Sequence, residues 1–253
     1  MVDHPVSVED YREALRRLLV AWRMHTARGI EVRVERVGVL SLVYPWVAQV
    51  HRFGRAFLQM EKHGYSHEAH VIVRSSLEHA LMAHWVAVTG DAGVASRYAE
   101  DDRLLRLLLD EAKGRPRDVT TSTWDLDLMQ ELVDSREPVG ADEEKVVQKI
   151  DQICERIGVR NTLYPAYRVH SWYAHPTTHT AAVYLQALDD GRFALRDKPA
   201  DPAPDATLSM ITHCAFWARR VLDDLAVGRP HERWLDGIAS SIQVMPRLPE
   251  PRA

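Results

Sequence analysis

The amino-acid sequence predicts an all-α fold: a helical bundle of about seven to eight helices with a small β-hairpin insertion near residues 182–196. Apolar residues recur every three or four positions through most of the chain, which is the spacing of an amphipathic helix. Glycine, proline and small polar residues separate these stretches, as they do at helix ends. Hydrophobic residues make up 46% of the chain and charged residues 27%, so its 253 residues can bury a globular core.

Four helices are predicted in the N-terminal half of the chain. Ser7, followed three residues later by Asp10, is typical of a capping box that starts the first helix, and Gly29 ends it. The segment 30–63 could begin as a strand, but we interpret it as one long helix kinked at Pro45, because proline removes an internal hydrogen bond. The expected helices lie at about 7–28, 30–63, 65–89 and 91–113.

The C-terminal half is predicted to hold further helices and one hairpin. The segment 182–196, AVYLQALDDGRFALR, has strand-forming residues on both sides of a DDG turn, which predicts a β-hairpin. We expect a single helical domain over 1–245, followed by a disordered tail over 246–253. The expected helices lie at about 122–135, 141–157, 162–174 and 205–227.

Charge and motif content restrict the classes of function. The net charge of −4 is opposite in sign to that of a generally basic nucleic-acid binder, so any contact with RNA must be local. The sequence contains no GxGxxG, GxxxxGK[ST] or GxSxG motif, which argues against a Rossmann enzyme, a P-loop NTPase and an α/β-hydrolase. It also shows no signal peptide and no long apolar run. We therefore expect a cytoplasmic protein with no membrane segment and no cofactor.

One segment, YPAYRVHSWYAHPTTH over 164–179, has the residue types of a catalytic site. Arg168 and His175 are seven residues apart, which is two helical turns, so both side chains project from nearly the same face. Ser171 lies between them on this stripe, and Tyr164 lies one turn before Arg168. A histidine can transfer a proton at a ribose hydroxyl and an arginine can hold a phosphate, without a metal. The alternative is a buried network that only ties helices together.

A second charged pair lies within an apolar helical segment, HVIVRSSLEHALMAHW. Arg74 and Glu78 are spaced i,i+4, so they form either a surface salt bridge or a buried pair with a further partner. Glu78 could hold Arg168 or fix the tautomer of His175, if the fold brings these residues together.

Histidine is abundant, with 13 residues, so a metal site has to be considered. His67 and His70 are spaced i,i+3, while Pro176 breaks the helix between His175 and His179, and no HExxH motif occurs. We expect no bound metal, although a small-molecule or metal enzyme that uses these four histidines stays as a third alternative. Five tryptophans lie on apolar helical stripes and are expected to pack in the core: Trp22, Trp46, Trp85, Trp172 and Trp217.

The segments RSSLEHALMAHW and YRVHSWYAH together resemble an uncharacterised family of bacterial all-helical proteins, similar in pattern to the HEPN superfamily. The resemblance covers roughly residues 40–185 and implies a helical HEPN-like core. HEPN ribonucleases carry an Arg followed, after four to six residues, by a His near a helix end, and Arg168 and His175 enclose six. Many members are metal-independent endoribonucleases of toxin–antitoxin and phage-defence systems, and they usually dimerise. The acidic residue that members carry on another helix matches Glu78.

Two functions follow as the main expectations. The first is a metal-independent endoribonuclease with His175 as general base or acid, Arg168 stabilising the phosphoryl transition state and Glu78 orienting one of them. Its substrate-binding residues would be Tyr164, Ser171 and Arg74, and its partners RNA, a second copy of the chain, and an antitoxin or defence component. The alternative is a non-catalytic helical interaction or assembly module, in which Arg168, His175 and Glu78 form a structural network.

Overall fold

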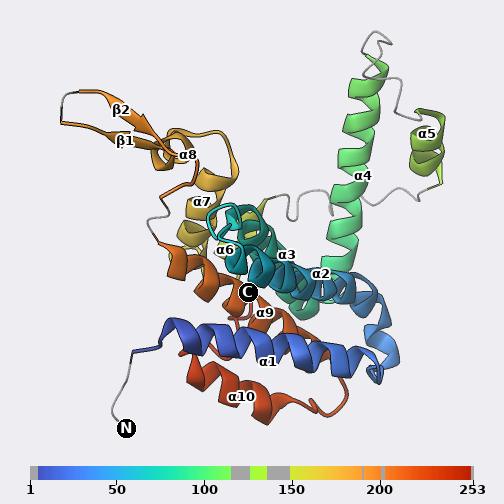
Figure 1. The fold of residues 1–253 in the computed structure, drawn as a ribbon. Helices are drawn as coiled ribbons and strands as arrows, with labels where there is room; N and C mark the ends of the chain where they lie inside the picture. The colour runs from blue at the N-terminus through green and yellow to red at the C-terminus, as the bar shows by residue number, and fades with distance from the viewer. Residues whose placement is uncertain (1–4, 115–125, 136–148, 190, 201–202, 252–253) are drawn as a thin grey trace.

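The computed structural model describes residues 5–114, 126–135, 149–189, 191–200 and 203–251. The fold is all-α with one small hairpin, as predicted, and ten α-helices occur within these ranges (Figure 1). In chain order the elements are α1 (Val8–Thr26), the 3-10 helix η1 (Val34–Arg36), α2 (Val37–Lys62), α3 (His70–Thr89), α4 (Asp91–Lys113), α5 (Leu126–Asp134), α6 (Ile150–Arg156), α7 (Leu163–Ala174), α8 (Thr178–Val183), β1 (Leu185–Ala187), β2 (Phe193–Leu195), α9 (Pro204–Leu225) and α10 (Glu232–Ser241).

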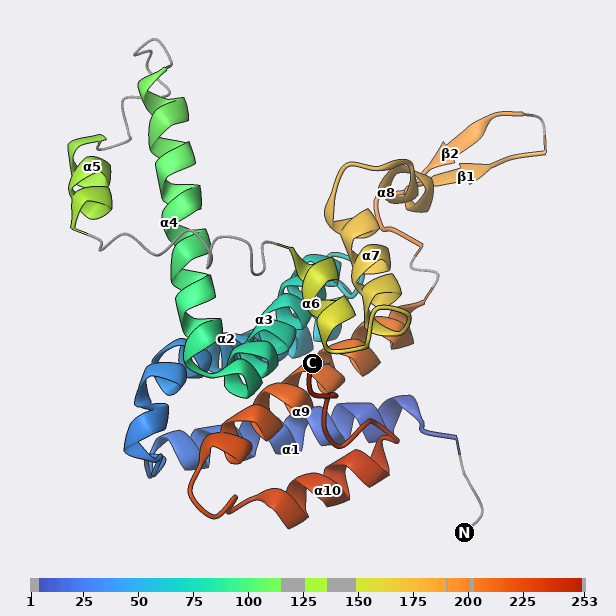
Figure 2. The ribbon, with the colours of Figure 1, turned by 180° about the vertical axis from the view of Figure 1, so that it is seen from behind.

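Helices α1, α2, α3 and α9 form the body of the molecule: α9 packs against the other three, and α2 packs against α3 (Figures 1 and 2). Helix α3 lies at the centre, because it contacts α2, α9, α4, α6 and α7. Its apolar positions Val73, Leu77, Ala80 and Leu81 recur at helical spacing and are fully buried. Burial of this stripe on several sides explains why α3 is apolar over most of its surface.

Local sequence signals set several of the helix ends. The hydroxyl of Ser7 accepts a hydrogen bond from the backbone N–H of Asp10 at 3.1 Å, and the Asp10 carboxylate accepts one from the Ser7 N–H at 2.8 Å. The predicted capping box is therefore confirmed. Gly90 ends α3 with a φ of +64°, a left-handed conformation that glycine adopts without a Cβ clash. Pro45 lies within α2, which is a single helix as predicted but begins at Val37 rather than at residue 30.

The strand that residues 30–44 could have formed is reduced to a single bridge. Val32 pairs with Ala226 in an isolated antiparallel bridge, and the chain then turns through η1 into α2. This bridge joins the α1–α2 connection to the end of α9.

Two parts of the chain extend from the body. Helices α4 and α5 form one arm, and α7, α8 and the hairpin form the other (Figures 1 and 2). The hairpin lies within the predicted segment, with Gln186 opposite Ala194 at its centre. Gly191, at a φ of +80°, supplies the left-handed turn residue, and Asp190 lies outside the described residues.

The C-terminal segment differs from the disordered tail expected over 246–253. Residues 246–251 lie against the body: Leu248 is buried, and Arg247 donates hydrogen bonds to Asp224 and Glu232. Apolar burial and paired charges hold this short segment, and neither feature was visible from its proline-rich sequence. Residues 252–253 lie outside the described part, as do 122–125 and 141–148 of two predicted helices.

Two short helices explain why the described residues contain more helices than the seven to eight predicted. Helices α8 and α10 were not predicted, since α8 has only six residues and α10 ten, which is too short for a strong periodic pattern. Within the described ranges, no helix combines the length and apolar composition needed to cross a membrane.

Candidate functional site

The candidate site is built on α7, which packs against α3. Leu163 and His170 are buried on the side of α7 that faces the body, at 6% and 3% exposure. The opposite side of the helix is open, because Arg168 and Val169 are exposed. One side of α7 therefore packs against the body of the molecule, and the other side is exposed to solvent.

Three side chains form a hydrogen-bonded group between α3 and α7, which we call the α3–α7 triad: Arg74, Glu78 and Tyr167. The Arg74 guanidinium donates to Glu78 Oε1 at 3.0 Å and to the Tyr167 hydroxyl at 2.9 Å. The Tyr167 hydroxyl donates in turn to the same Glu78 oxygen at 2.9 Å. Burial raises the pKa of Tyr167, and the Glu78 carboxylate helps to keep its hydroxyl protonated as a donor.

The structure thus gives Glu78 partners other than those considered from the sequence. The predicted i,i+4 pair of Arg74 and Glu78 is present, but no hydrogen bond or ion pair within the described residues joins Glu78 to Arg168 or His175. Tyr167 was missed from the sequence. Its hydroxyl meets partners about ninety positions earlier in the chain, and no local spacing signals such a contact.

Arg168 and His175 both lie on the surface, so they do not form the buried network that was the alternative to a catalytic site. Neither side chain is held in a network with another described residue. Ser171 and Tyr164 lie beside them and are half-buried. The Ser171 hydroxyl donates to the Tyr167 carbonyl at 2.8 Å, which leaves its lone pairs as acceptors.

The end of α7 fixes the backbone of His175. This residue is the C-cap of the helix, with an extended conformation that precedes Pro176, as the sequence predicts. The Thr180 hydroxyl is within 2.7 Å of the His175 carbonyl and 2.9 Å of the Trp172 carbonyl, and the Thr177 hydroxyl lies 2.7 Å from the latter. These threonine hydroxyls form hydrogen bonds with backbone carbonyls that have no partner within the helix. The backbone that carries the His175 imidazole is therefore fixed.

Trp172 is a correction to the sequence analysis, which expected it in the core. It is 38% exposed and stacks on His179, with ring centroids 4.5 Å apart and planes 15° apart. By helical spacing it lies on the same side of α7 as Arg168 and His175, and we call these three residues the α7 face. Of the other tryptophans expected in the core, Trp22, Trp85 and Trp217 are buried and Trp46 is partly buried.

The four histidines considered for a metal site are divided: His67 and His70 belong to a buried cluster, whereas His175 and His179 are exposed. His67, His70 and His170 are buried, and Nδ1 of His70 lies 2.7 Å from Nδ1 of His170. Burial, followed by the neighbouring His70, lowers the pKa of His170 to about 3. Among the described residues, no three His, Cys, Asp or Glu side chains are grouped to hold a metal ion.

Comparison with known families matches residues 41–193, more than half of the chain, to a family of unknown function, DUF5677. The chain belongs to the DUF5677 family. The DUF5677 match begins in α2 and ends at the start of β2, so it contains both the α3–α7 triad and the α7 face. Helices α1, α9 and α10, which complete the core, lie outside it. No curated protein and no solved structure matches the chain.

Proposed function

We propose that this DUF5677 protein is a metal-independent endoribonuclease of the HEPN-like type, acting in a toxin or phage-defence context, and that the α7 face binds the RNA. The observation that carries the proposal is that Arg168, Trp172 and His175 are all exposed, at positions that helical spacing places on one side of α7: a cation, a stacked aromatic ring and an imidazole. Arginine binds phosphate oxygens through its planar guanidinium, and an exposed tryptophan can stack on an unpaired base.

The chemistry assigned to His175 is proton transfer at the ribose. The imidazole takes the proton of a 2′-hydroxyl, and the 2′-oxygen then attacks the adjacent phosphorus. The bond from phosphorus to the 5′-oxygen breaks, this oxygen takes up a proton from water, and the imidazolium gives its proton to the hydroxide that remains. Arg168 stabilises the negative charge that grows on the phosphoryl oxygens. The products are a 2′,3′-cyclic phosphate and a 5′-hydroxyl end.

The α3–α7 triad acts in this proposal as a positioning group. Glu78 is already engaged by Arg74 and Tyr167, so it orients α7 through Tyr167 rather than acting directly on Arg168 or His175. Ser171 and Tyr164 flank the face and can contact the sugar–phosphate backbone. A homodimer, and an antitoxin or defence component as partner protein, belong to the same proposal through the HEPN resemblance.

The non-catalytic interaction module stays as the second candidate, because several apolar side chains are exposed outside the body. On α4, Leu104 and Leu107 are about half exposed, and on β2, Phe193 and Leu195 are more exposed still. Exposed apolar patches are typical of protein-binding surfaces. A folded protein that shows no cleavage of any RNA would favour this second candidate.

RNA cleavage by matched variants tests the proposal. Wild-type protein in EDTA should cleave a single-stranded RNA, and His175→Ala should reduce the rate by at least about a hundredfold, the usual contribution of general acid–base catalysis. Arg168→Ala should reduce it as well. The controls are His63→Ala and Arg52→Ala, which remove an exposed histidine and an exposed arginine on or beside α2.

The variants are compared by circular dichroism first, so that a loss of cleavage is not a loss of fold. Both proposed residues are exposed, and we expect their substitution to leave the unfolding temperature unchanged. Cleavage by His175→Ala at the wild-type rate would contradict the assignment.

A further inference from the structure

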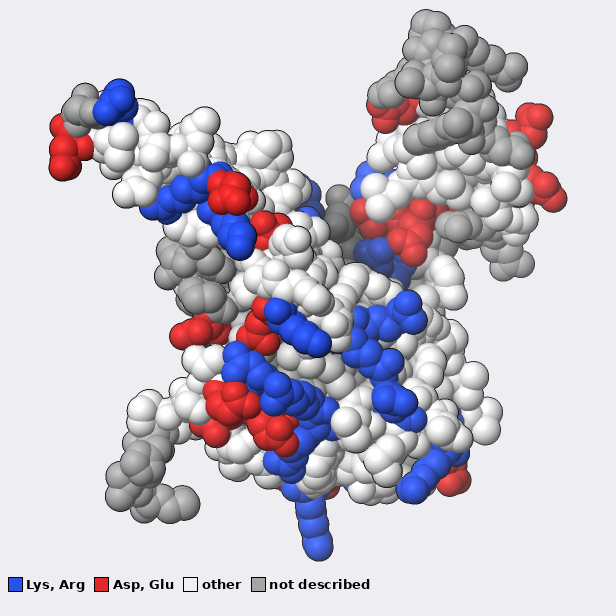
Figure 3. Space-filling view, in the orientation of Figure 1, with Lys and Arg blue, Asp and Glu red and all other residues white. Residues whose placement is uncertain are grey.

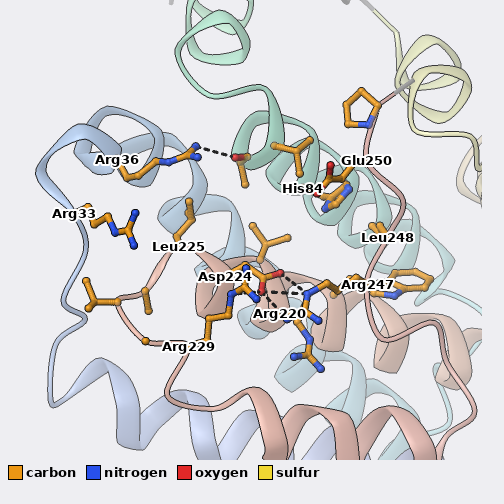
Figure 4. Close-up of a pocket in the computed structure, with 18 residues that line it drawn as sticks. Arg33, Arg36, His84, Arg220, Asp224, Leu225, Arg229, Arg247, Leu248 and Glu250 are labelled. Atoms are coloured by element: carbon orange, nitrogen blue, oxygen red, sulfur yellow. Dashed lines mark hydrogen bonds and ion pairs between the residues drawn. The ribbon is translucent and has the colours of Figure 1, made fainter. Parts of the chain in front are cut away.

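A cavity of about 990 Å³ lies on another part of the molecule, at the C-terminal end of α9. It is bounded by residues 33–36, the last turns of α3, the turn 226–229 and the C-terminal segment 247–251 (Figure 4). Its volume is that of a typical small-molecule site, about 300–1,000 Å³. We call it the arginine pocket, after five of its lining residues: Arg33, Arg36, Arg220, Arg229 and Arg247.

Positive charge exceeds negative charge in this pocket. Among the described residues that line it, two carboxylates, Asp224 and Glu250, face the five arginines. Glu232 and Asp236, which are not lining residues, pair with Arg229 and Arg220. Asp224 is already engaged by Arg247 at 3.0 Å and by Arg229 at 3.5 Å. Arg247 donates hydrogen bonds to the carboxylates of Asp224 and Glu232, which raise the pKa of Arg247 and hold its guanidinium in place.

Two arginines supply the unbalanced charge. The Arg33 side chain has no hydrogen bond or ion pair within the described part of the chain, and the Arg36 guanidinium donates there only to the Ala87 carbonyl, at 3.3 Å. Figure 4 shows both on one side of the cavity, across from Asp224, Arg229 and Arg247. Deeper in the wall, Arg220 is 2% exposed and donates to Asp236, while its Nε and Nη1 atoms have no partner among the described residues.

The turn that carries Arg229 is held in a strained conformation. Arg229 has a φ of +47°, in the left-handed region that disfavours residues with a Cβ. Such strained residues are often found at ligand sites. Apolar side chains of Val221, Leu225 and Leu248 complete the lining, so the pocket offers both cationic and apolar walls.

We infer that the arginine pocket binds a small phosphorylated molecule. Its phosphate groups lie between Arg33 and Arg36 on one side and Arg229 on the other, and its less polar part lies against Leu225 and Leu248. Arginine is suited to this task because two of its N–H groups can bind two phosphate oxygens at once. The site is distinct from the α7 face and is formed largely by α9 and the C-terminal segment, outside the DUF5677 match.

Titration calorimetry of the full-length protein at low salt tests this inference with three probes: pyrophosphate, ADP and adenosine. Pyrophosphate and ADP should bind at sub-millimolar concentration, and adenosine at least about tenfold more weakly, because it lacks the charged groups that arginine contacts. The double substitution Arg33→Ala, Arg36→Ala should weaken ADP binding by at least about tenfold, as the loss of charge-assisted hydrogen bonds does. Both residues are exposed, so the variant should keep its fold.

Two control variants separate this site from the proposed ribonuclease site. Arg168→Ala and Arg52→Ala should bind ADP like the wild type. The inference is overturned by the absence of pyrophosphate and ADP binding, by equal binding of adenosine and ADP, or by unchanged affinity in the double variant. Loss of ADP binding in Arg168→Ala alone would place the phosphate on the α7 face instead. RNA binding through Arg33 and Arg36 without any binding of pyrophosphate would also overturn it.

Discussion

His170 illustrates, at the scale of single residues, how the core constrains protonation. Its Nδ1 atom shares a hydrogen bond with Nδ1 of His70, which requires one ring to donate and the other to accept. If both Nδ1 atoms carried protons, two donors would face each other in a buried site. Burial lowers the pKa of His170 to about 3, that of His51 to about 3 and that of His213 to about 4.

These buried histidines predict that the protein loses stability in mild acid. In the unfolded chain each would titrate near its usual pKa of about 6.5, so between that pH and about 4 the unfolded state binds more protons. Their contribution to the free energy of unfolding is complete above pH 6.5 and falls as the pH is lowered towards the folded pKa values. Each histidine accounts for a slope of at most about 1.4 kcal/mol per pH unit.

Urea unfolding of wild type and His170→Gln between pH 7 and pH 4 measures this effect. The free energy of unfolding of the variant should fall less steeply as the pH is lowered, because glutamine does not titrate. The difference in slope should correspond to about one proton fewer taken up on unfolding. The exposed residue His63 provides the control, and His63→Gln should follow the wild-type curve. A His170→Gln curve parallel to that of the wild type would contradict the role given to this pair.

At the scale of residues, the sequence predicts which side chains share one face of a helix better than it predicts which side chains meet between helices. The seven-residue spacing of Arg168 and His175 predicts that both lie on one stripe of α7 and its C-cap, and both residues are exposed. It could not tell which stripe faces α3, and therefore Trp172 was wrongly expected in the core. Tyr167 and the His70–His170 pair depend on the fold, since their partners are distant in sequence.

At the scale of elements, the contact between α3 and α7 determines where the α7 face is presented. The α3–α7 triad contributes polar bonds at the edge of this contact, and Leu163 and His170 contribute buried area. Helix bounds near strong caps, such as Ser7 and Gly90, could be predicted because local chemistry sets them. The packed C-terminal segment could not, because tertiary contacts alone order it.

A double-mutant cycle of Glu78→Gln and Tyr167→Phe measures the coupling across this contact. We expect a coupling free energy of about 0.5–1.5 kcal/mol, the usual range for a hydrogen bond between neighbouring side chains. Tyr164→Phe is the matched control, because the Tyr164 hydroxyl has no hydrogen bond to another described residue. Additive effects of the two substitutions would show that the triad does not hold α7 against α3.

At the scale of the whole molecule, two arms extend from one helical body, and charge is unevenly distributed over them. On the face shown in Figure 3, Lys and Arg side chains are mainly on the body, whereas acidic side chains predominate on the α4–α5 arm. The α7 face lies on the other arm, near the hairpin (Figure 1). The net charge of −4 therefore does not describe the field at every surface, which is consistent with local binding of an anion.

The central claim is that the protein cleaves RNA through a 2′-hydroxyl without a metal. The most direct measurement is single-turnover cleavage, in EDTA, of one oligonucleotide made as RNA and as its 2′-O-methyl counterpart, with the product ends identified by mass spectrometry. We predict that wild-type protein cuts only the RNA and leaves a 2′,3′-cyclic phosphate and a 5′-hydroxyl, and that His175→Ala cuts neither. Cleavage of the 2′-O-methyl strand, or no cleavage of RNA by folded wild-type protein, would contradict the claim.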